Sequence, residues 1–344
     1  MSKTNPGRFF EDYRLGEVIA HAVPRTLSGG ERALYHALYP ARHALASSDD
    51  FARACGLAAA PLDEFIVFHT VFGKTVPDIS LNAVANLGYA EGRFLAPVFP
   101  GDTLRAESRV IGLKQNSNGK SGVVWVRTRG LNQHGAAVLE YVRWVMVRKR
   151  DPDAAAPVTV VPDLAPAVAA HDLVVPPGLD FTRYDFALAG ESHRWGDYAV
   201  GEVIGHVDGV TVEEAEHMLA TRLWQNTAKV HFDARVREDR RRLIYGGHVI
   251  SLARALSFNG LANAQPVLAI NAGSHANPCF AGDTVTAWSE VLDKAGTRAP
   301  GVGAIRLRLV ATKGEGPGAG LKDGAGRYLP HVLLDMDFWA LMPL

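Results

Sequence analysis

The chain contains one pattern twice, and this repeat restricts its fold more than any other feature of the sequence. Residues 12–21 read DYRLGEVIAH and residues 197–206 read DYAVGEVIGH, with seven of ten positions identical. Residues 97–110 (PVFPGDTLRAESRV) match residues 278–291 (PCFAGDTVTAWSEV) at eight of fourteen positions. The two matches occur in the same order, and their offsets differ by only four residues. The chain is therefore predicted to be one fold written twice.

The segment between the two copies is rich in proline. Residues 151–177 hold six of the chain's 19 prolines and few charges. Proline fixes φ and lacks a backbone donor, so this segment is expected to be extended rather than packed. We place an N-terminal unit at residues 1–150, a Pro- and Ala-rich linker at residues 151–180 and a C-terminal unit at residues 181–344.

Each unit contains the same order of predicted helices, an early one followed by a more apolar one. The predicted helices cover residues 27–38, 62–75, 212–224 and 247–258. Ser28 with Glu31, and Thr211 with Glu214, have the spacing of a capping box. The two early helices are therefore predicted to begin in the same way.

Strand patterns follow the apolar helix in both units. Residues 123–147 contain two strand-like runs around a polar turn with Asn132 and Gly135, which predicts a hairpin, and residues 303–311 give another strand. An antiparallel sheet wrapped around one apolar helix would bury that helix on most sides. We therefore predict an α+β fold in which two such units merge their sheets within one chain, a double hotdog.

The composition excludes several classes of protein. The 36 Lys and Arg balance the 36 Asp and Glu, which argues against a general nucleic-acid or anionic-membrane binder. Cys55 and Cys279 are too few for a disulfide framework, which fits a reducing cytoplasm. No apolar run reaches the roughly 18 residues of a membrane helix, and the N-terminus has no secretory h-region. We expect a cytoplasmic protein without a membrane partner.

The sequence also gives no indication of a resident cofactor. Its thirteen histidines are scattered, and neither cysteine lies in a CxxC or CxxH cluster, so no metal site is predicted. No GxGxxG follows a strand, so no dinucleotide site is predicted.

Several segments of the chain resemble a known family. The repeated PxFxGDT segments resemble the shared strand of MaoC-like hydratases, the R-specific enoyl-CoA hydratase branch of the hotdog fold. Residues 222–231 (RLWQNTAKVH) lie where that family has its hydratase motif, a pattern like RLxGDxNPxH. Residues 72–91, 141–151, 221–232 and 243–264 resemble more narrowly the mesaconyl-CoA hydratase (β-methylmalyl-CoA dehydratase) family. The resemblance implies reversible hydration of a branched C4 enoyl-CoA thioester, mesaconyl-CoA.

The hydratase motif departs from the wider family at three positions. Aligned on the histidine, Asn226 stands where that family has its catalytic Asp, Ala228 replaces Asn and Lys229 replaces Pro. An amide cannot take a proton from water as a carboxylate can, so the usual Asp–His mechanism does not transfer intact. The narrower family is similar to this chain in its TRLxQNTxKVHF pattern, which favours a subfamily variant.

A glycine pair at the start of the second apolar helix is the candidate oxyanion hole. Hydration needs donors for the thioester oxygen, and free N–H groups at a helix N-terminus can supply them. The family resemblance places this role on Gly246, and Gly247 is the neighbouring alternative. The alternative interpretation is that both glycines only permit close helix packing.

The first unit lacks these features. Its matching helix start, residues 65–70, contains no glycine, and His69 pairs with His248 in this register. The position that aligns with His231 is Ala46. The chemistry is therefore expected in the second unit, with the first shaping the acyl pocket.

His231 is the first choice for proton transfer, because a neutral imidazole titrates near the working pH. A histidine between apolar Val230 and Phe232 is more often structural, but its motif position favours catalysis here. Asn226 is expected to bind the water or the substrate's hydroxyl. Further candidates for acid–base chemistry are Asp233, His248, Tyr245, Glu64 and Asp78.

A dicarboxylic thioester also needs a cation for its free carboxylate. Arg222 fits the motif position best, with Arg242 and Arg93 as alternatives. The charged residues 237–242 and 148–150 could meet the CoA phosphates. An acyl-CoA thioester is thus the expected partner, and further pairing of hotdog sheets predicts a homo-oligomer.

Two other functions remain open from the sequence. Hotdog folds also include thioesterases, in which water attacks the thioester carbonyl and releases free thiol. The missing catalytic Asp would also fit a non-catalytic acyl-CoA-binding protein. Fold alone does not separate these alternatives.

Overall fold

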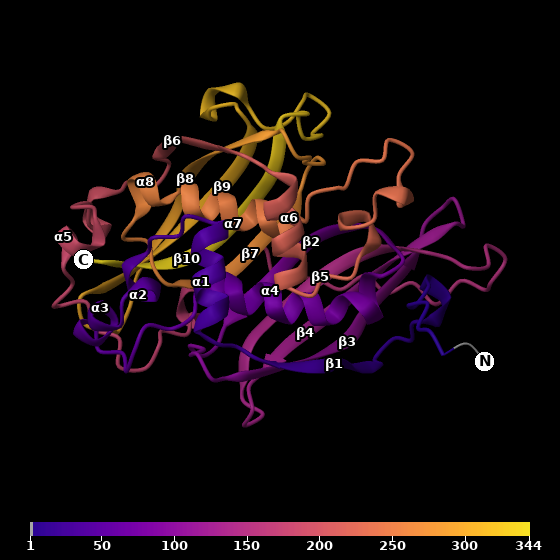
Figure 1. Ribbon diagram of the computed structural model, residues 1–344, viewed down its shortest axis with the longest axis horizontal. Helices are drawn as coiled ribbons and strands as arrows, with labels where there is room; N and C mark the ends of the chain where they lie inside the picture. Colours follow the sequence, from indigo (N-terminus) through magenta and orange to yellow (C-terminus); the bar gives the residue numbers. More distant parts are fainter. Residues whose placement is uncertain (1–2) are drawn as a thin grey trace.

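The computed structural model describes residues 3–344 and contains one antiparallel sheet of ten strands (Figure 1). The first unit contributes β1 (Val18–Thr26), β2 (Ala83–Phe94), β3 (Thr103–Gln115), β4 (Ser121–Leu131) and β5 (Ala137–Arg148). The second contributes β6 (Val203–Thr211), β7 (Val267–His275), β8 (Thr284–Gly296), β9 (Val302–Lys313) and β10 (Val332–Pro343). The predicted hairpin at residues 123–147 is therefore confirmed as β4 and β5.

The strand order shows how the two copies join. It runs β1-β3-β4-β5-β2-β7-β10-β9-β8-β6, so the second half repeats the first in reverse about its centre. At that centre β2 pairs with β7, with Tyr89 opposite Gly273 and Arg93 opposite Ala269. The two sheets are thus continuous through backbone hydrogen bonds, and the predicted double hotdog arrangement is confirmed.

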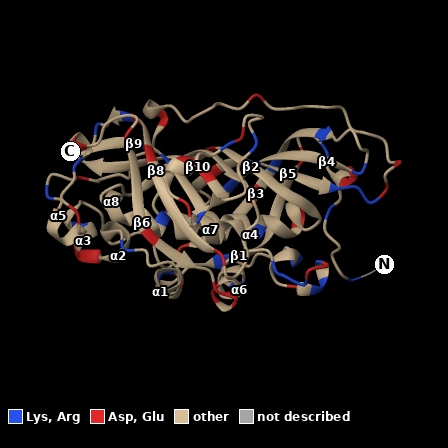
Figure 2. Cartoon of the chain, turned by 90° about the horizontal axis from the view of Figure 1, so that it is seen from above, with Lys and Arg blue, Asp and Glu red and all other residues tan. Residues whose placement is uncertain are grey.

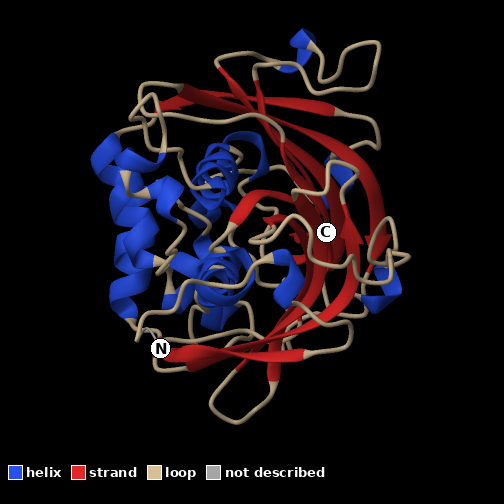
Figure 3. Ribbon diagram, turned by 90° about the vertical axis from the view of Figure 1, so that its right-hand side faces the viewer, coloured by secondary structure: helices blue, strands red, loops and turns tan. Residues whose placement is uncertain are grey.

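Two apolar helices, α4 (Glu64–Thr75) and α7 (Gly246–Leu256), occupy the middle of the molecule. The sheet curves around them in Figure 3, and all residues of α4 after Glu64 and of α7 after Gly246 are buried. This burial is what an apolar helix enclosed by a sheet requires, as predicted. The remaining α-helices are α1 (Gly29–Leu38), α2 (Ala44–Ser47), α3 (Asp49–Ala54), α5 (Phe186–Ala189), α6 (Glu214–Leu223) and α8 (Phe258–Leu261), and a π-helical turn, Val76–Ser80, follows α4.

The two predicted capping boxes have different outcomes. At α1, Ser28 Oγ accepts a hydrogen bond from the N–H of Gly30 at 3.1 Å, and the Glu31 carboxylate accepts one from the N–H of Ser28 at 2.7 Å. At α6 the prediction is wrong. Thr211 ends β6 and its hydroxyl binds that of Thr284 at 2.8 Å, so the sheet uses the side chain that was expected to cap the helix.

The two repeated segments of each unit bind one another. In the first unit, Nε2 of His21 lies 2.8 Å from Oγ of Ser108. In the second, Nε2 of His206 lies 2.8 Å from Oγ of Ser289. All four side chains are buried, so the repeated histidine fixes the edge strand of each unit to its neighbour. Asp78, a predicted carboxylate candidate, binds Nδ1 of His21 at 2.8 Å and belongs to this contact.

The linker is irregular, mostly exposed and attached to both units at a few points. The N–H of Val168 donates to Oδ1 of Asn271 at 2.9 Å, and its carbonyl accepts from the indole N–H of Trp339 at 3.0 Å. Val160 exchanges two backbone hydrogen bonds with Leu113. Most of residues 151–177 are exposed or half-buried and lack regular structure, so the linker is not packed as a core element and is attached to the outside of both units at these few points.

Charged side chains of both signs are interspersed along the chain (Figure 2), and several pair across strands, as Arg306 does with Asp337 and Arg308 with Asp335. Within residues 3–344, every helix is too short or too polar to cross a membrane.

Candidate active site

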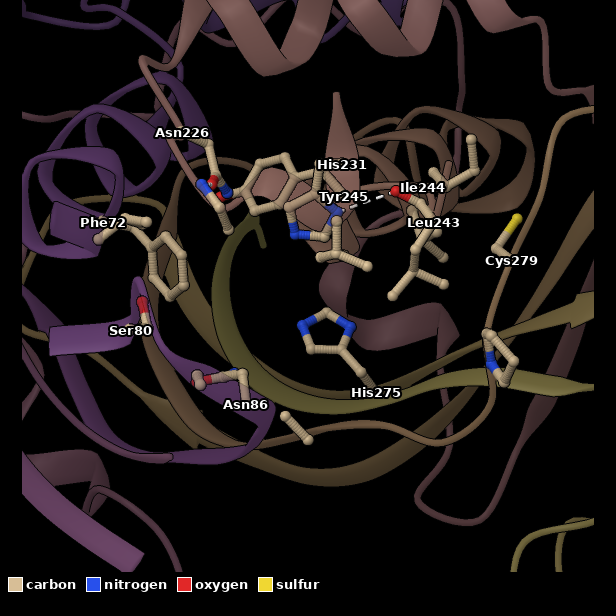
Figure 4. A pocket seen from close by; sticks show the side chains of 18 of the residues that line it. Phe72, Ser80, Asn86, Asn226, His231, Leu243, Ile244, Tyr245, His275 and Cys279 are labelled. Carbon is tan, nitrogen blue, oxygen red and sulfur yellow. Dashed lines mark hydrogen bonds between the residues drawn. The ribbon is translucent and has the colours of Figure 1, made fainter. Parts of the chain in front are cut away.

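A cavity of about 310 Å³ lies where the two units meet (Figure 4). The first unit contributes one wall through the end of α4, the following turn and strands β2 and β5. The second contributes the start of α7, the loop before it and the end of β7. The polar lining residues are Ser80, Asn86, Tyr89, Arg143, Asn226, His231, Tyr245, His275 and Asn277.

The start of α7 opens onto this cavity. Gly246 is the first residue of the helix, lines the cavity and is partly accessible from it. No side chain caps the helix, and within residues 3–344 the N–H of Gly246 forms no hydrogen bond. A free N–H at a helix N-terminus carries partial positive charge and binds anions. Gly246 therefore presents the donor that an oxyanion requires.

Close packing explains why this position is glycine. A Cβ atom on Gly246 would lie 2.4–2.7 Å from the imidazole ring of His275. Gly247 faces elsewhere, since it is buried and its Cβ position lies 2.4 Å from the ring of Tyr245. Of the two predicted glycines, the structure thus brings Gly246 to the cavity, whereas Gly247 serves packing.

His231 lies in the cavity wall with one fixed tautomer. Its Nδ1 is 2.9 Å from the main-chain oxygen of Leu243, drawn as a dashed line in Figure 4. A carbonyl oxygen only accepts, so Nδ1 carries the proton and Nε2 of the neutral ring keeps its lone pair. Burial lowers the pKa of His231 to about 4, which keeps the ring neutral at pH 7. This neutral ring can therefore accept a proton at Nε2.

Asn226 has one amide atom already engaged. Its Oδ1 accepts a hydrogen bond from the N–H of Ala228 at 3.0 Å, which leaves the NH2 group for the cavity. Asn226 can donate to an oxygen of water or substrate, but it cannot take a proton. The binding role of Asn226 stays a prediction.

Tyr245 lies beside the oxyanion position and packs against His231, with ring centroids 5.7 Å apart. Its N–H donates to Nε2 of His217 at 3.0 Å, which holds the loop before α7 in place. Burial raises the pKa of the Tyr245 phenol well above its usual value, so the hydroxyl stays protonated, and it lies 3.4 Å from Nδ1 of His69.

Three predicted acid–base candidates lie outside the cavity. His248 binds the hydroxyl of Tyr39 through Nδ1 at 3.0 Å, and so ties α7 to the end of α1. Asp233 pairs with Arg235 through two hydrogen bonds of 2.9 Å, which lowers its pKa to about 2. Glu64 lies at the start of the other central helix, where burial raises its pKa to about 8.

Among residues 3–344, no Asp or Glu lines the cavity at all. A carboxylate base is therefore absent from the described walls, and the groups there that can accept a proton are imidazoles. His231 and His275 are the two in question.

His275 was missed in the sequence. It ends β7, lies across the cavity from His231 in Figure 4, and its Nε2 is 3.1 Å from the hydroxyl of Tyr89. Burial lowers its pKa to about 4. One signal was present, because the matching position in the first repeat is Phe94. A polar residue in one copy and an apolar residue in the other marks a position that the copies use differently.

The arginines predicted to bind the substrate's carboxylate lie outside the cavity. Arg222 is exposed on α6, Arg242 pairs with Glu214, and Arg93 pairs with Glu140, so none of them lines the cavity. The cation in the cavity wall is Arg143, on β5, which sequence reasoning also missed. Its signal was an arginine inside the otherwise apolar run of residues 141–147.

The equivalent position in the first unit is closed. The carboxylate of Asp63 caps α4 by accepting from the N–H of Phe65 at 2.9 Å. Since α4 begins at Glu64 and α7 at Gly246, His69 corresponds to Ser251 and not to His248, which corrects the predicted register. These two equivalent residues bind one another, with Nε2 of His69 2.8 Å from Oγ of Ser251.

Comparison with known proteins gives consistent results. The family model described as mesaconyl-CoA hydratase matches residues 2–317. The chain is 79% identical over 341 residues to "Mesaconyl-CoA hydratase" of Cereibacter sphaeroides, covering 99% of both chains. It is 60% identical over 350 residues to "Beta-methylmalyl-CoA dehydratase" of Chloroflexus aurantiacus, again covering 99% of both.

Solved structures agree with the fold. A MaoC domain protein dehydratase from Chloroflexus aurantiacus superposes with a TM-score of 0.97 at 59% identity, covering 100% of this chain and 99% of the other. A Mycobacterium tuberculosis protein described as having a double hotdog fold gives 0.77 at 27% identity, covering 98% of each.

Proposed function

The chain belongs to the mesaconyl-CoA hydratase family, and from this membership we propose that it catalyses the reversible hydration of mesaconyl-CoA to β-methylmalyl-CoA. The observation that carries the proposal is the pairing, in one cavity, of an uncapped helix start at Gly246 with a neutral His231 whose Nε2 is free to accept a proton. These are the two groups that water addition to an enoyl thioester needs.

The thioester oxygen is placed at the start of α7. As water adds to the β-carbon, negative charge develops on that oxygen, and the N–H of Gly246 donates to it. A donor fixed in place before the reaction stabilises the transition state by about 3–4 kcal/mol. Tyr245 shapes the wall beside this position, while its hydroxyl lies 3.4 Å from Nδ1 of His69.

His231 transfers the proton. Its Nε2 takes a proton from water while the water oxygen forms the new bond to the β-carbon, which gives an enolate. The imidazolium then returns that proton to the α-carbon, so that one whole water molecule has added. The NH2 group of Asn226 holds the water oxygen during the first step and the new hydroxyl afterwards. The same groups act in reverse order during dehydration.

An assay of the purified protein with mesaconyl-CoA tests this function. Hydration removes the enoyl chromophore without releasing thiol, so absorbance and a thiol-trapping reagent are followed together. Release of free thiol would identify a thioesterase instead, and tight binding without either signal would identify an acyl-CoA-binding protein. Activity confined to a different enoyl-CoA would overturn the substrate.

We propose further that the reaction needs no resident cofactor. A backbone N–H polarises the thioester and an imidazole moves the proton, so both tasks fall to the chain itself. Within residues 3–344 no cluster of three His, Cys, Asp or Glu side chains has the arrangement of a metal site. Unchanged turnover after prolonged treatment with a chelator is the expected result.

A further inference from the structure

We propose that Arg143, together with Ser80 and Asn86, recognises the free carboxylate of the substrate and makes this cavity specific for a dicarboxylic enoyl thioester. This inference rests on the proposed function, because it concerns the part of mesaconyl-CoA that does not react. The three residues line the cavity from the first unit.

Arg143 is a buried charge without a partner of opposite sign. Arg143 has no exposed surface. Within residues 3–344, no carboxylate oxygen lies within 4.0 Å of its guanidinium nitrogens, the distance that defines an ion pair. Its guanidinium donates to Oγ1 of Thr75 at 2.7 Å and to Oγ of Ser80 at 3.3 Å, lies over the ring of Phe72 at 4.4 Å, and leaves Nε unpaired. Arginine does not give up its proton, and an isolated buried charge is costly.

A second buried arginine, Arg254 on α7, shows how this fold can compensate such a charge. Counted from the helix starts at Glu64 and Gly246, Arg254 on α7 occupies the position that Phe72 occupies on α4. The Arg254 guanidinium lies 5.9 Å from the centre of the Phe338 ring. Arg254 is also buried, but the acidic side chain of Asp63 lies close enough to act on it electrostatically. The groups that act electrostatically on Arg143 are tyrosines. Within residues 3–344, Arg254 therefore has an acidic neighbour and Arg143 has none.

A polar side chain beside Arg143, that of Asn86, also lacks hydrogen-bond partners. Both amide atoms of Asn86 are buried and have no hydrogen-bond partner within the described chain. In Figure 4, Ser80 and Asn86 lie on the same side of the cavity, opposite Cys279. A carboxylate at this end would accept from the Asn86 NH2 group and from the Ser80 hydroxyl, with the Arg143 charge next to it.

The position fits the chemistry of the proposed substrate. In mesaconyl-CoA the free carboxylate is attached to the β-carbon, the atom that water attacks. Arg143 is the one Lys, Arg, Asp or Glu among the described lining residues, so this cavity favours an anion there. It also explains why an amide at position 226 is tolerated, since a carboxylate base would repel the substrate's own carboxylate.

The test compares two substrates that differ in one group. In 2-methylcrotonyl-CoA a methyl group replaces the free carboxylate of mesaconyl-CoA. We expect Arg143→Met to lower kcat/KM for mesaconyl-CoA by about 10²–10³-fold while changing kcat/KM for 2-methylcrotonyl-CoA by less than threefold. Arg254→Met is the matched control, because it removes a buried arginine outside the cavity and should leave the ratio of the two values unchanged.

The outcomes separate the two proposals. If the wild-type protein hydrates neither substrate, the proposed function fails. If wild type hydrates mesaconyl-CoA but a folded Arg143→Met loses both substrates equally, the function stands and the carboxylate site is overturned. If Arg143→Met does not fold, inhibition of the wild type decides. Methylsuccinyl-CoA should then inhibit at least tenfold more tightly than 2-methylbutyryl-CoA, and equal inhibition would overturn the site.

Discussion

Nδ1 of His231 donates a hydrogen bond of 2.9 Å to the main-chain carbonyl of Leu243, and this contact decides which nitrogen of the ring is free for chemistry. Leu243 belongs to the same loop that leads into α7, so the base and the oxyanion donor are held by one short stretch of chain.

His231→Ala should lower kcat for mesaconyl-CoA by about 100-fold or more, since a positioned acid–base group contributes roughly that much. Steady-state kinetics on protein with an unchanged circular dichroism spectrum is the measurement. His248→Gln is the control, because His248 binds Tyr39 outside the cavity, and its activity should stay within threefold. A loss below threefold in His231→Ala would instead assign proton transfer to His275.

Low pH should destabilise the protein before it titrates the base. Burial lowers the pKa of His69 and His217 to about 3, and of His231, His248 and His275 to about 4. Below the unfolded value near 6.5 the unfolded chain binds more protons than the folded chain. The free energy of unfolding is therefore complete above pH 6.5 and falls towards pH 4, by roughly 1.4 kcal/mol per pH unit for each such histidine.

Chemical denaturation between pH 8 and pH 5 measures this dependence. Initial rates taken after brief exposure should stay level down to about pH 5, because His231 remains neutral while the fold persists. Constant stability from pH 7 to pH 5 would contradict the buried neutral histidines.

Gly246→Ala should lower kcat/KM for mesaconyl-CoA by about 10²–10³-fold, the cost of losing one oxyanion donor. The added methyl group meets the His275 ring at 2.4 Å, so the helix start or the ring must move. Gly296→Ala, at the end of β8, is the control, because its methyl group meets nothing within 4 Å. Wild-type kinetics from Gly246→Ala would remove the oxyanion role from this N–H group.

Asn226→Asp restores the carboxylate of the wider hydratase motif, yet it should not improve the enzyme. The new carboxylate would lie near the carboxylate on the substrate's β-carbon, and like charges at close range repel. We expect kcat/KM for mesaconyl-CoA to fall tenfold or more relative to 2-methylcrotonyl-CoA. Equal changes for both substrates would indicate that charge at position 226 is unimportant.

Ser108→Ala should leave hydratase activity within twofold of wild type, and neither protein should release free thiol from the substrate. Ser108, His21 and Asp78 resemble a hydrolytic triad in their contacts, but Ser108 is fully buried and lines no described cavity. Its loss leaves buried polar groups unpaired, which costs about 1–3 kcal/mol of stability. Ser289→Ala in the other copy should cost a similar amount in thermal denaturation. Abolished turnover in folded Ser108→Ala would refute a structural role.

Several features were predictable because they are written in local patterns. The repeat at His21 and His206 predicts duplication, the Ser28 capping box predicts the start of α1, and the apolar run after Gly246 predicts a buried helix. Each depends on neighbours in sequence, where spacing determines which side chains meet. His231 was found in the same way, from its position in a motif.

Other features could not be read from spacing. Thr211 has the pattern of a cap but is used by the sheet, and Asp233 follows the motif histidine but pairs with Arg235 outside the cavity. A short motif does not say which of its side chains turn inward, because that depends on packing against elements far along the chain.

Local patterns in the chain are enough to predict one fold repeated, with the chemical groups of one helix start and one motif retained in the second copy. The completion of the site depends on how the two copies pack. His275 and Arg143 lie on strands that are far from the motif in sequence, and they meet it because β2 and β7 join the two sheets. A cavity between two copies is a property of their packing, so its far wall follows from strand pairing and from no single segment.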